Sequence, residues 1–116
     1  MRIAWKECVA ELIGTFALCF IGAGAICTDA LTKGQVGLIG IAMAHGLVLS
    51  IAVSSTMAIS GGQLNPAVTL ARAASDTFAG IRPVDVPGFI LAQGVGATGA
   101  VALFRWLSGG FTWEKK

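Results

Sequence analysis

The chain has 116 residues, of which 55% are hydrophobic and only 12% are charged, and its mean hydropathy is +0.80. Soluble domains contain roughly 25% charged residues, so this composition excludes an ordinary soluble domain and indicates a membrane protein of one domain. The net charge of +2 is small, and the sequence has no basic cluster with interleaved aromatic residues. Nucleic acid is therefore excluded as a partner.

The cysteines and the single histidine give no sign of a cofactor or a metal ion. The cysteines stand in apolar surroundings, and an odd number argues against a disulfide framework. No cysteine and histidine pair has the spacing of zinc ligands. We therefore expect no metal, no cofactor and three small buried side chains at Cys8, Cys19 and Cys27.

Three segments have the length and apolarity of membrane-spanning helices, which need about 20 apolar residues. They are residues 8–27, 36–59 and 86–107. The second has 24 residues without Lys, Arg, Asp or Glu and would reach about 36 Å. A cleaved signal peptide is the alternative for the first segment, but Glu7 and Glu11 do not fit its start. We expect an integral, multi-pass protein of the cell membrane, with the lipid bilayer around it.

Small residues recur every four positions in the second and third segments. Such stripes let membrane helices approach one another closely, so we expect both to be packing faces. The stripes consist of Ala42, Gly46, Ser50, Ser54 and Ala58 in the second segment, and of Gly88, Ala92, Gly96 and Ala100 in the third.

Residues 60–75 interrupt the apolar pattern with the parts of a short helix start. Asn65 can act as N-cap, and Pro66 stands at the first helical position, where proline is tolerated. Gly61 and Gly62 let the backbone before them run extended and exposed. Lipid cannot satisfy free amide and carbonyl groups, so in a membrane protein such a segment must line a cavity. This run is the candidate functional site, and a plain capped helix start is the alternative.

Four short motifs stand in the order and spacing of one membrane protein family. They are Glu11-Leu12-Ile13-Gly14-Thr15-Phe16, Ala44-His45-Gly46-Leu47, the run Ser60-Gly61-Gly62-Gln63-Leu64-Asn65-Pro66-Ala67-Val68-Thr69-Leu70, and Ala92-Gln93 with Gly96 and Gly99. Together they resemble the N-terminal half of the aquaporin, or major intrinsic protein, family. The resemblance covers nearly the whole chain.

The resemblance implies an all-α membrane fold, in which six helices form two inverted halves, each with a re-entrant half-helix. Residues 1–116 resemble the first half, with three transmembrane helices and one re-entrant half-helix. A member of this family is a channel for passive diffusion of water or small neutral solutes such as glycerol, and is no enzyme. The family's second Asn-Pro-Ala motif and the arginine after it are absent here, so one chain would not enclose the pore.

Several explanations stay open for the missing half. Two copies can pair in opposite orientations, which the lysines and arginines permit because each side of the membrane would hold four of them. A partner chain can instead supply a complementary half-channel, or the chain can be a truncated, non-conducting fragment. A different class of protein is a small oligomeric transporter that uses Glu11 to bind a proton.

The resemblance also implies which residues line the pore. Asn65 would face the pore and donate from its amide, at the positive end of the half-helix that begins with Pro66 and Ala67. Three carbonyl groups before it would accept hydrogen bonds from the solutes, those of Gly61, Gly62 and Gln63.

His45 occupies a position that the family gives to its narrow selectivity region, where a bulky aromatic residue is usual. A smaller, polar histidine there would favour a wetter constriction and small hydroxylated or amide solutes, and it can titrate near neutral pH. The alternative is a histidine that packs between helices with a hydrogen bond to a neighbouring carbonyl group.

Glu11 is an acid within a membrane helix, which is costly unless the acid is paired. The resemblance implies hydrogen bonds to Glu11 from backbone amides of the re-entrant loop, with Gln93 as a further support of loop or helix contacts. Arg72, after the half-helix, is expected to be a solvated or headgroup-facing charge.

Overall fold

The structure is a computed structural model that describes residues 5–74 and 82–109. Within these ranges every regular element is helical. In chain order the elements are α1 (Trp5–Leu18), a π-helical turn η1 (Cys19–Ala23), α2 (Gly24–Leu31), α3 (Gly37–Ser60), α4 (Pro66–Ala74), a 3-10 turn η2 (Pro83–Asp85) and α5 (Val86–Leu107).

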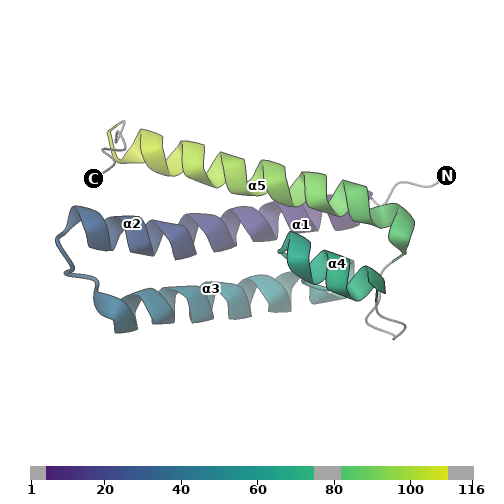
Figure 1. The fold of residues 1–116 in the computed structure, drawn as a ribbon, viewed down its shortest axis with the longest axis horizontal. Helices are drawn as coiled ribbons and strands as arrows, with labels where there is room; N and C mark the ends of the chain where they lie inside the picture. Colours follow the sequence, from purple (N-terminus) through teal and green to yellow (C-terminus); the bar gives the residue numbers. More distant parts are fainter. Residues whose placement is uncertain (1–4, 75–81, 110–116) are drawn as a thin grey trace.

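The helices form three long rods and one short piece (Figure 1). The rods Trp5–Leu31, Gly37–Ser60 and Pro83–Leu107 have 27, 24 and 25 residues, and each is long and apolar enough to cross a membrane. At 1.5 Å per residue they reach about 36–40 Å, more than the roughly 30 Å of a bilayer core. This confirms the predicted all-α fold class. The first rod begins earlier and ends later than the expected 8–27, because the helix continues past its apolar section at both ends.

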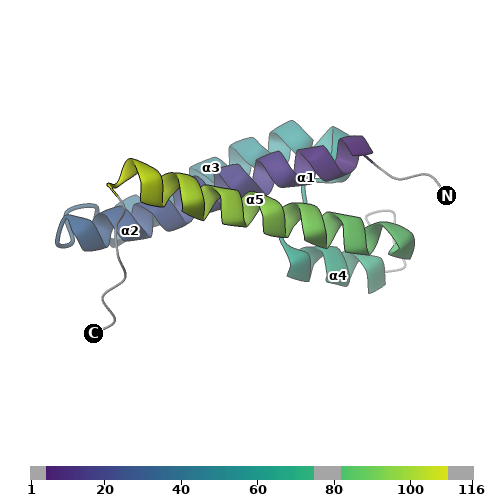
Figure 2. The same cartoon turned by 90° about the horizontal axis from the view of Figure 1, so that it is seen from above.

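The chain packs around the contact between α1 and α5, which lie along one another in both ribbon views (Figures 1 and 2). Gly96 lets the helices approach, because a Cβ there would lie 3.1 Å from the backbone nitrogen of Phe16 and would clash with the carbonyl oxygen of Leu12. Nearer the start of α5, a Cβ on Gly88 would lie 3.3 Å from the sulfur of Cys8. The small-residue stripe of the third segment is therefore a packing face, as predicted.

Within the described chain, the small-residue stripe of α3 is not a packing face. Its buried residues are Val48, Ala52, Thr56 and Ser60, four residues apart, whereas the small-residue stripe from Ala42 to Ala58 is exposed. The two lines are offset by two residues, or about 200° around the helix. The physical reason is that α3 touches the rest of the chain through one narrow line, so its small residues face outward.

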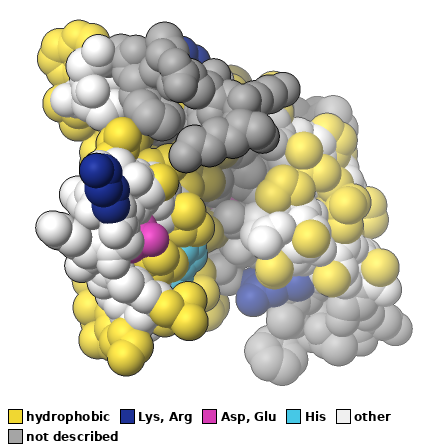
Figure 3. All heavy atoms as spheres, turned by 60° about the vertical axis from the view of Figure 1, so that its left-hand side comes forward, with side chains coloured by type: hydrophobic (Ala, Val, Ile, Leu, Met, Phe, Trp, Pro, Cys, Tyr) yellow, Lys and Arg dark blue, Asp and Glu magenta, His cyan; other side chains and the backbone are white. Residues whose placement is uncertain are grey.

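The outer surface of the described chain is strongly apolar, and Figure 3 shows hydrophobic side chains over much of one face. Leu38 and Ile39 on α3 are each 81% exposed. In water this would be a large cost, whereas in a bilayer such side chains contact lipid. The three cysteines are free and half-buried, so they are less buried than expected.

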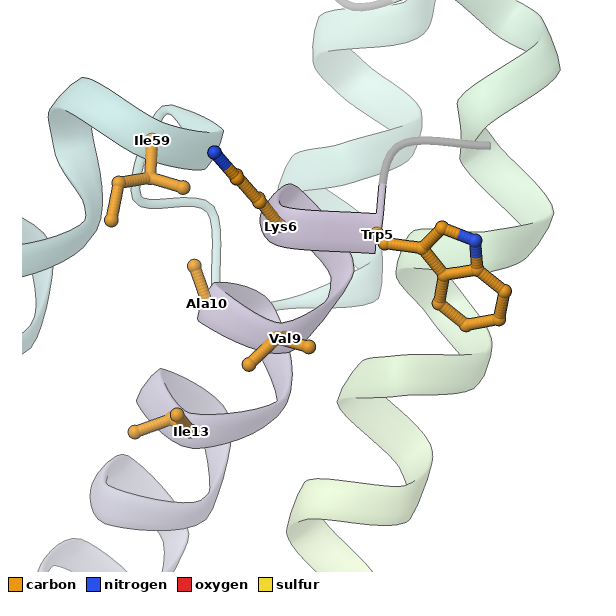
Figure 4. A pocket seen from close by; sticks show the side chains of 6 residues that line it. All are labelled: Trp5, Lys6, Val9, Ala10, Ile13 and Ile59. Carbon is orange, nitrogen blue, oxygen red and sulfur yellow. The ribbon is translucent and has the colours of Figure 1, made fainter. Parts of the chain in front are cut away.

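An open groove of about 590 Å³ lies between the start of α1 and the end of α3 (Figure 4). Its lining is almost entirely apolar, and Ile59 reaches into it from α3. It contains none of the predicted pore residues, so it is separate from the candidate site. The lining residues are Trp5, Lys6, Val9, Ala10, Ile13 and Ile59.

Candidate functional site

The loop between α3 and α4 starts with two glycines in left-handed conformations. The φ angle of Gly61 is +88°, and its amide donates to the carbonyl of Met57 over 3.1 Å, which ends α3. The φ angle of Gly62 is +62°, and a Cβ there would lie 3.2 Å from the carbonyl oxygen of Val53. The expectation of an extended, exposed backbone is wrong here, because Gly62 is buried and the chain turns sharply.

Leu64 then anchors the loop to α1. It adopts a left-handed conformation with φ +56°, which is unusual for a residue with a side chain. Its side chain is only 2% exposed and packs against the bare backbone of Gly14. Burial of this leucine offsets the backbone strain, and it needs a glycine on the facing helix.

The carboxylate of Glu11 is the centre of the loop's hydrogen bonds, and its side chain is fully buried. Its Oε1 accepts from the backbone nitrogen of Leu64 over 2.7 Å. Its Oε2 accepts from the hydroxyl of Ser60 over 2.6 Å and from the backbone nitrogen of Gln63 over 3.2 Å. The same Oε1 accepts from the side-chain nitrogen of Gln93 over 2.7 Å. Both oxygens thus act only as acceptors, for four donors.

Gln93 carries this network from the loop to the half-helix. Its side-chain nitrogen donates to Glu11 and also to the hydroxyl oxygen of Thr69, 2.9 Å away. Thr69 is fully buried on α4, which lies beside the first half of α5 (Figures 1 and 2). The sequence alone assigns no role to Thr69. Its role as an acceptor is visible only from the position of Gln93, which lies 24 residues later in the sequence on α5.

The start of α4 is capped as the sequence predicts for a helix. The side-chain oxygen of Asn65 accepts from the backbone nitrogen of Ala67 over 2.8 Å, and Pro66 is the first helical residue. All three residues are exposed, in contrast to the buried Gln63 and Leu64 just before them. Within the described ranges the amide nitrogen of Asn65 has no hydrogen-bond partner.

Arg72 lies elsewhere than expected. Instead of being a solvated or headgroup-facing charge, it is half-buried and donates from Nη1 to the carbonyl oxygen of Gly61 over 2.7 Å. The bond joins the last turn of α4 to the first residue of the loop. It is possible because residue 61 turns its carbonyl toward α4, and no pattern within the helix itself predicts it. One of the three carbonyl groups expected to face solutes therefore already accepts a hydrogen bond from the protein.

His45 lies on α3, half-buried. Its Nδ1 is 2.9 Å from the carbonyl oxygen of Ile41, and because a carbonyl only accepts, Nδ1 carries the hydrogen. A Cβ on Gly22 would lie 2.9 Å from both Cδ2 and Nε2 of the ring. The histidine thus makes the neighbouring carbonyl bond of the helix-packing alternative, and its other nitrogen sits against the first rod.

The described residues contain no group of His, Cys, Asp and Glu side chains that could hold a metal ion. They also place the predicted residues in two clusters. Glu11, Gln63 and Gln93 belong to a buried network, whereas Asn65, Pro66 and Ala67 form an exposed helix start beside it. Residue 75, the last of the expected half-helix, lies outside the described residues.

Comparison with known proteins agrees with this architecture. The family model described as "Major intrinsic protein" matches residues 2–115. Aquaporin NIP1-1 of Zea mays is 39% identical over 105 residues, which are 90% of this chain and 36% of that protein. Aquaglyceroporin-3 of Trypanosoma brucei brucei is 36% identical over 97 residues, 84% of this chain and 31% of that protein.

Probable aquaporin NIP7-1 of Arabidopsis thaliana is 44% identical over 92 residues, which are 79% of this chain and 32% of that protein. The chain thus spans about a third of the length of these relatives. Its three long apolar helices, its capped half-helix and a family match over nearly all its residues agree with one another. The protein is an integral membrane protein and belongs to the major intrinsic protein family.

Proposed function

We propose that this chain supplies one half of a channel for passive diffusion of water and small neutral solutes such as glycerol, and that it is no enzyme. The observation that carries the proposal is the exposed start of α4. The side-chain oxygen of Asn65 is engaged by Ala67, so the amide nitrogen is the end left to donate to a water or hydroxyl oxygen. The names aquaporin and aquaglyceroporin among the relatives support both solutes.

The row of carbonyl groups before Asn65 supplies the acceptors. In the described ranges the carbonyl oxygens of Gly62 and Gln63 have no protein donor, and we assign both as acceptors for solutes. Gly61 shares its carbonyl with Arg72 and contributes one lone pair fewer. Pro66 and Ala67 line the pore beside Asn65, and His45 belongs to its narrow region.

Glu11 and Gln93 hold the loop in shape in this proposal. Each carboxylate oxygen of Glu11 already accepts hydrogen bonds from two donors. A proton added to either oxygen would therefore compete with the hydrogen atoms that these groups donate. This geometry supports a holding role rather than that of a proton carrier in a coupled transporter. The alternative of a proton-coupled transporter makes a different prediction. Such a transporter would lose proton-dependent uptake with Glu11→Gln, whereas Asn65→Ala would leave its uptake unchanged.

Residues 1–116 supply one half of the pore in this proposal, and a second copy in the opposite orientation or a complementary chain can supply the other. The outward small-residue stripe of α3 supports this, since it offers close approach to a helix outside the chain. The balance of four basic residues on each side supports a second copy. A topology assay that finds the C-terminus on one side of the membrane only would exclude the antiparallel pair and leave the partner chain.

The test is stopped-flow light scattering of proteoliposomes in a glycerol gradient. Shrinkage and reswelling faster than in empty liposomes, changed by Asn65→Asp, would support a pore lined by this residue. Gln35→Glu makes the same amide-to-acid change in the exposed loop before α3 and is the matched control. No excess over empty liposomes, in any variant, would refute the proposal for this chain on its own and favour the non-conducting alternative.

A further inference from the structure

The π-helical turn η1 places a glycine directly against the only histidine of the chain. A π-helical turn takes in an extra residue and so rotates the helix that follows it, and such turns are frequent at functional sites. Here Gly22 is buried and its bare backbone lies under the edge of the His45 ring. A Cβ at this position would lie 2.9 Å from both Cδ2 and Nε2.

Both the turn and the ring are fixed by further contacts. Phe20, in the same turn, stacks on Phe16 with ring centroids 5.9 Å apart, and it forms a T-shaped pair with Phe104 on α5 whose centroids are 6.3 Å apart. The ring of His45 is tied on its other side by the 2.9 Å bond from Nδ1 to Ile41. The imidazole therefore lies between its own helix and the first rod, and a Cβ beneath it would require the ring to shift.

We propose that Gly22 is a positioning residue that sets where the His45 ring stands, and thereby the width of the pore at this level. The consequence for the pore rests on the proposed function. An alanine at position 22 would push the ring back by about 0.5 Å, from 2.9 Å to the 3.4 Å at which ordinary contact begins. The atoms nearest to the added Cβ are Cδ2 and Nε2, at the end of the His45 side chain. We therefore expect the ring to move and the helices to stay in place.

The first measurement is independent of transport. Because the chain has one histidine, carbethoxylation by diethyl pyrocarbonate at this residue is read directly by mass spectrometry of the detergent-solubilised protein. Gly22→Ala is expected to slow the reaction, because the added methyl group lies against Cδ2 and Nε2 and shields Nε2 from the reagent. Gly94→Ala is the matched control, because a Cβ there meets nothing within 4 Å. Equal rates in Gly22→Ala, Gly94→Ala and the unchanged protein would overturn the proposal.

The second measurement compares glycerol and water permeability in proteoliposomes. One methyl group in a fitted site changes discrimination by about tenfold, so Gly22→Ala is expected to lower the glycerol-to-water ratio by up to that factor. In a His45→Ala background the same change should have no effect, because the ring that transmits it is gone. An equal loss with and without the ring would assign Gly22 to general packing and overturn the proposal. If even the unchanged protein does not exceed empty liposomes, the channel proposal fails, and the carbethoxylation rates alone decide on Gly22.

Discussion

Substitution of Gly96 by alanine tests the close contact between α1 and α5. A Cβ at position 96 would lie 3.1 Å from the backbone nitrogen of Phe16 and 3.2 Å from the carbonyl carbon of Leu12, and it would clash with the carbonyl oxygen of Leu12. All three are backbone atoms of α1, so no side chain can swing away. The two helices must separate, and overpacking of this kind costs about 1–3 kcal/mol.

Gly94→Ala gives the reference that isolates this cost. Both glycines lie within α5, and replacing either by alanine gains about 1 kcal/mol of helix propensity, which cancels in the comparison. A Cβ at position 94 meets nothing within 4 Å. The free energy of unfolding of Gly96→Ala should therefore be about 1–3 kcal/mol below that of Gly94→Ala.

The assay is unfolding by sodium dodecyl sulfate in mixed detergent micelles, followed by circular dichroism. Separation of the helices would also stretch the bond between Glu11 and Gln93, since Gln93 lies one helical turn before Gly96 and is likewise buried. Equal stabilities of the Gly96→Ala and Gly94→Ala proteins would refute the argument, because they would show that α1 and α5 are not in backbone contact here.

Three other substitutions test the loop. Glu11→Gln puts an amide group opposite two of four donors and should cost about 2–4 kcal/mol in the same unfolding assay, and a neutral effect would contradict the network. Thr69→Val should cost only about 1 kcal/mol, because Gln93 keeps its bond to Glu11; a loss as large as that of Glu11→Gln would contradict this ranking. Arg72→Met removes the donor to the Gly61 carbonyl and should speed amide hydrogen exchange in the loop, whereas unchanged exchange would show that the bond does not hold it.

Much of the fold was predictable because its signals are local. Apolar length alone locates the three long helices to within a few residues, and Asn65 followed by Pro66 marks the start of α4. The Glu11 partners were also within reach, but only through the family resemblance. The carboxylate needed donors, and sequence spacing alone does not say that Ser60 and Gln93 are among them.

The remaining features depend on contacts between distant segments or on backbone angles. The bond from Arg72 to Gly61 requires the left-handed turn at residue 61, and no charge pattern encodes it. The packing face of α3 was misjudged because a four-residue period of small side chains fits a face turned outward as well as one turned inward. The π-helical turn at Cys19–Ala23 has no composition of its own, so the contact between Gly22 and His45 was hidden as well.

The hydrogen bonds of Glu11 have a consequence for the order in which the protein is made. Glu11 precedes Ser60 by 49 residues and Gln93 by 82, so the first rod is synthesised before its partners exist. An unpaired acidic side chain within a membrane helix is costly to insert, and Glu11 is the seventh of the 27 residues of the first rod. Glu11 therefore gains three of its four donors with residues 60–64 and the fourth only when α5 is in place.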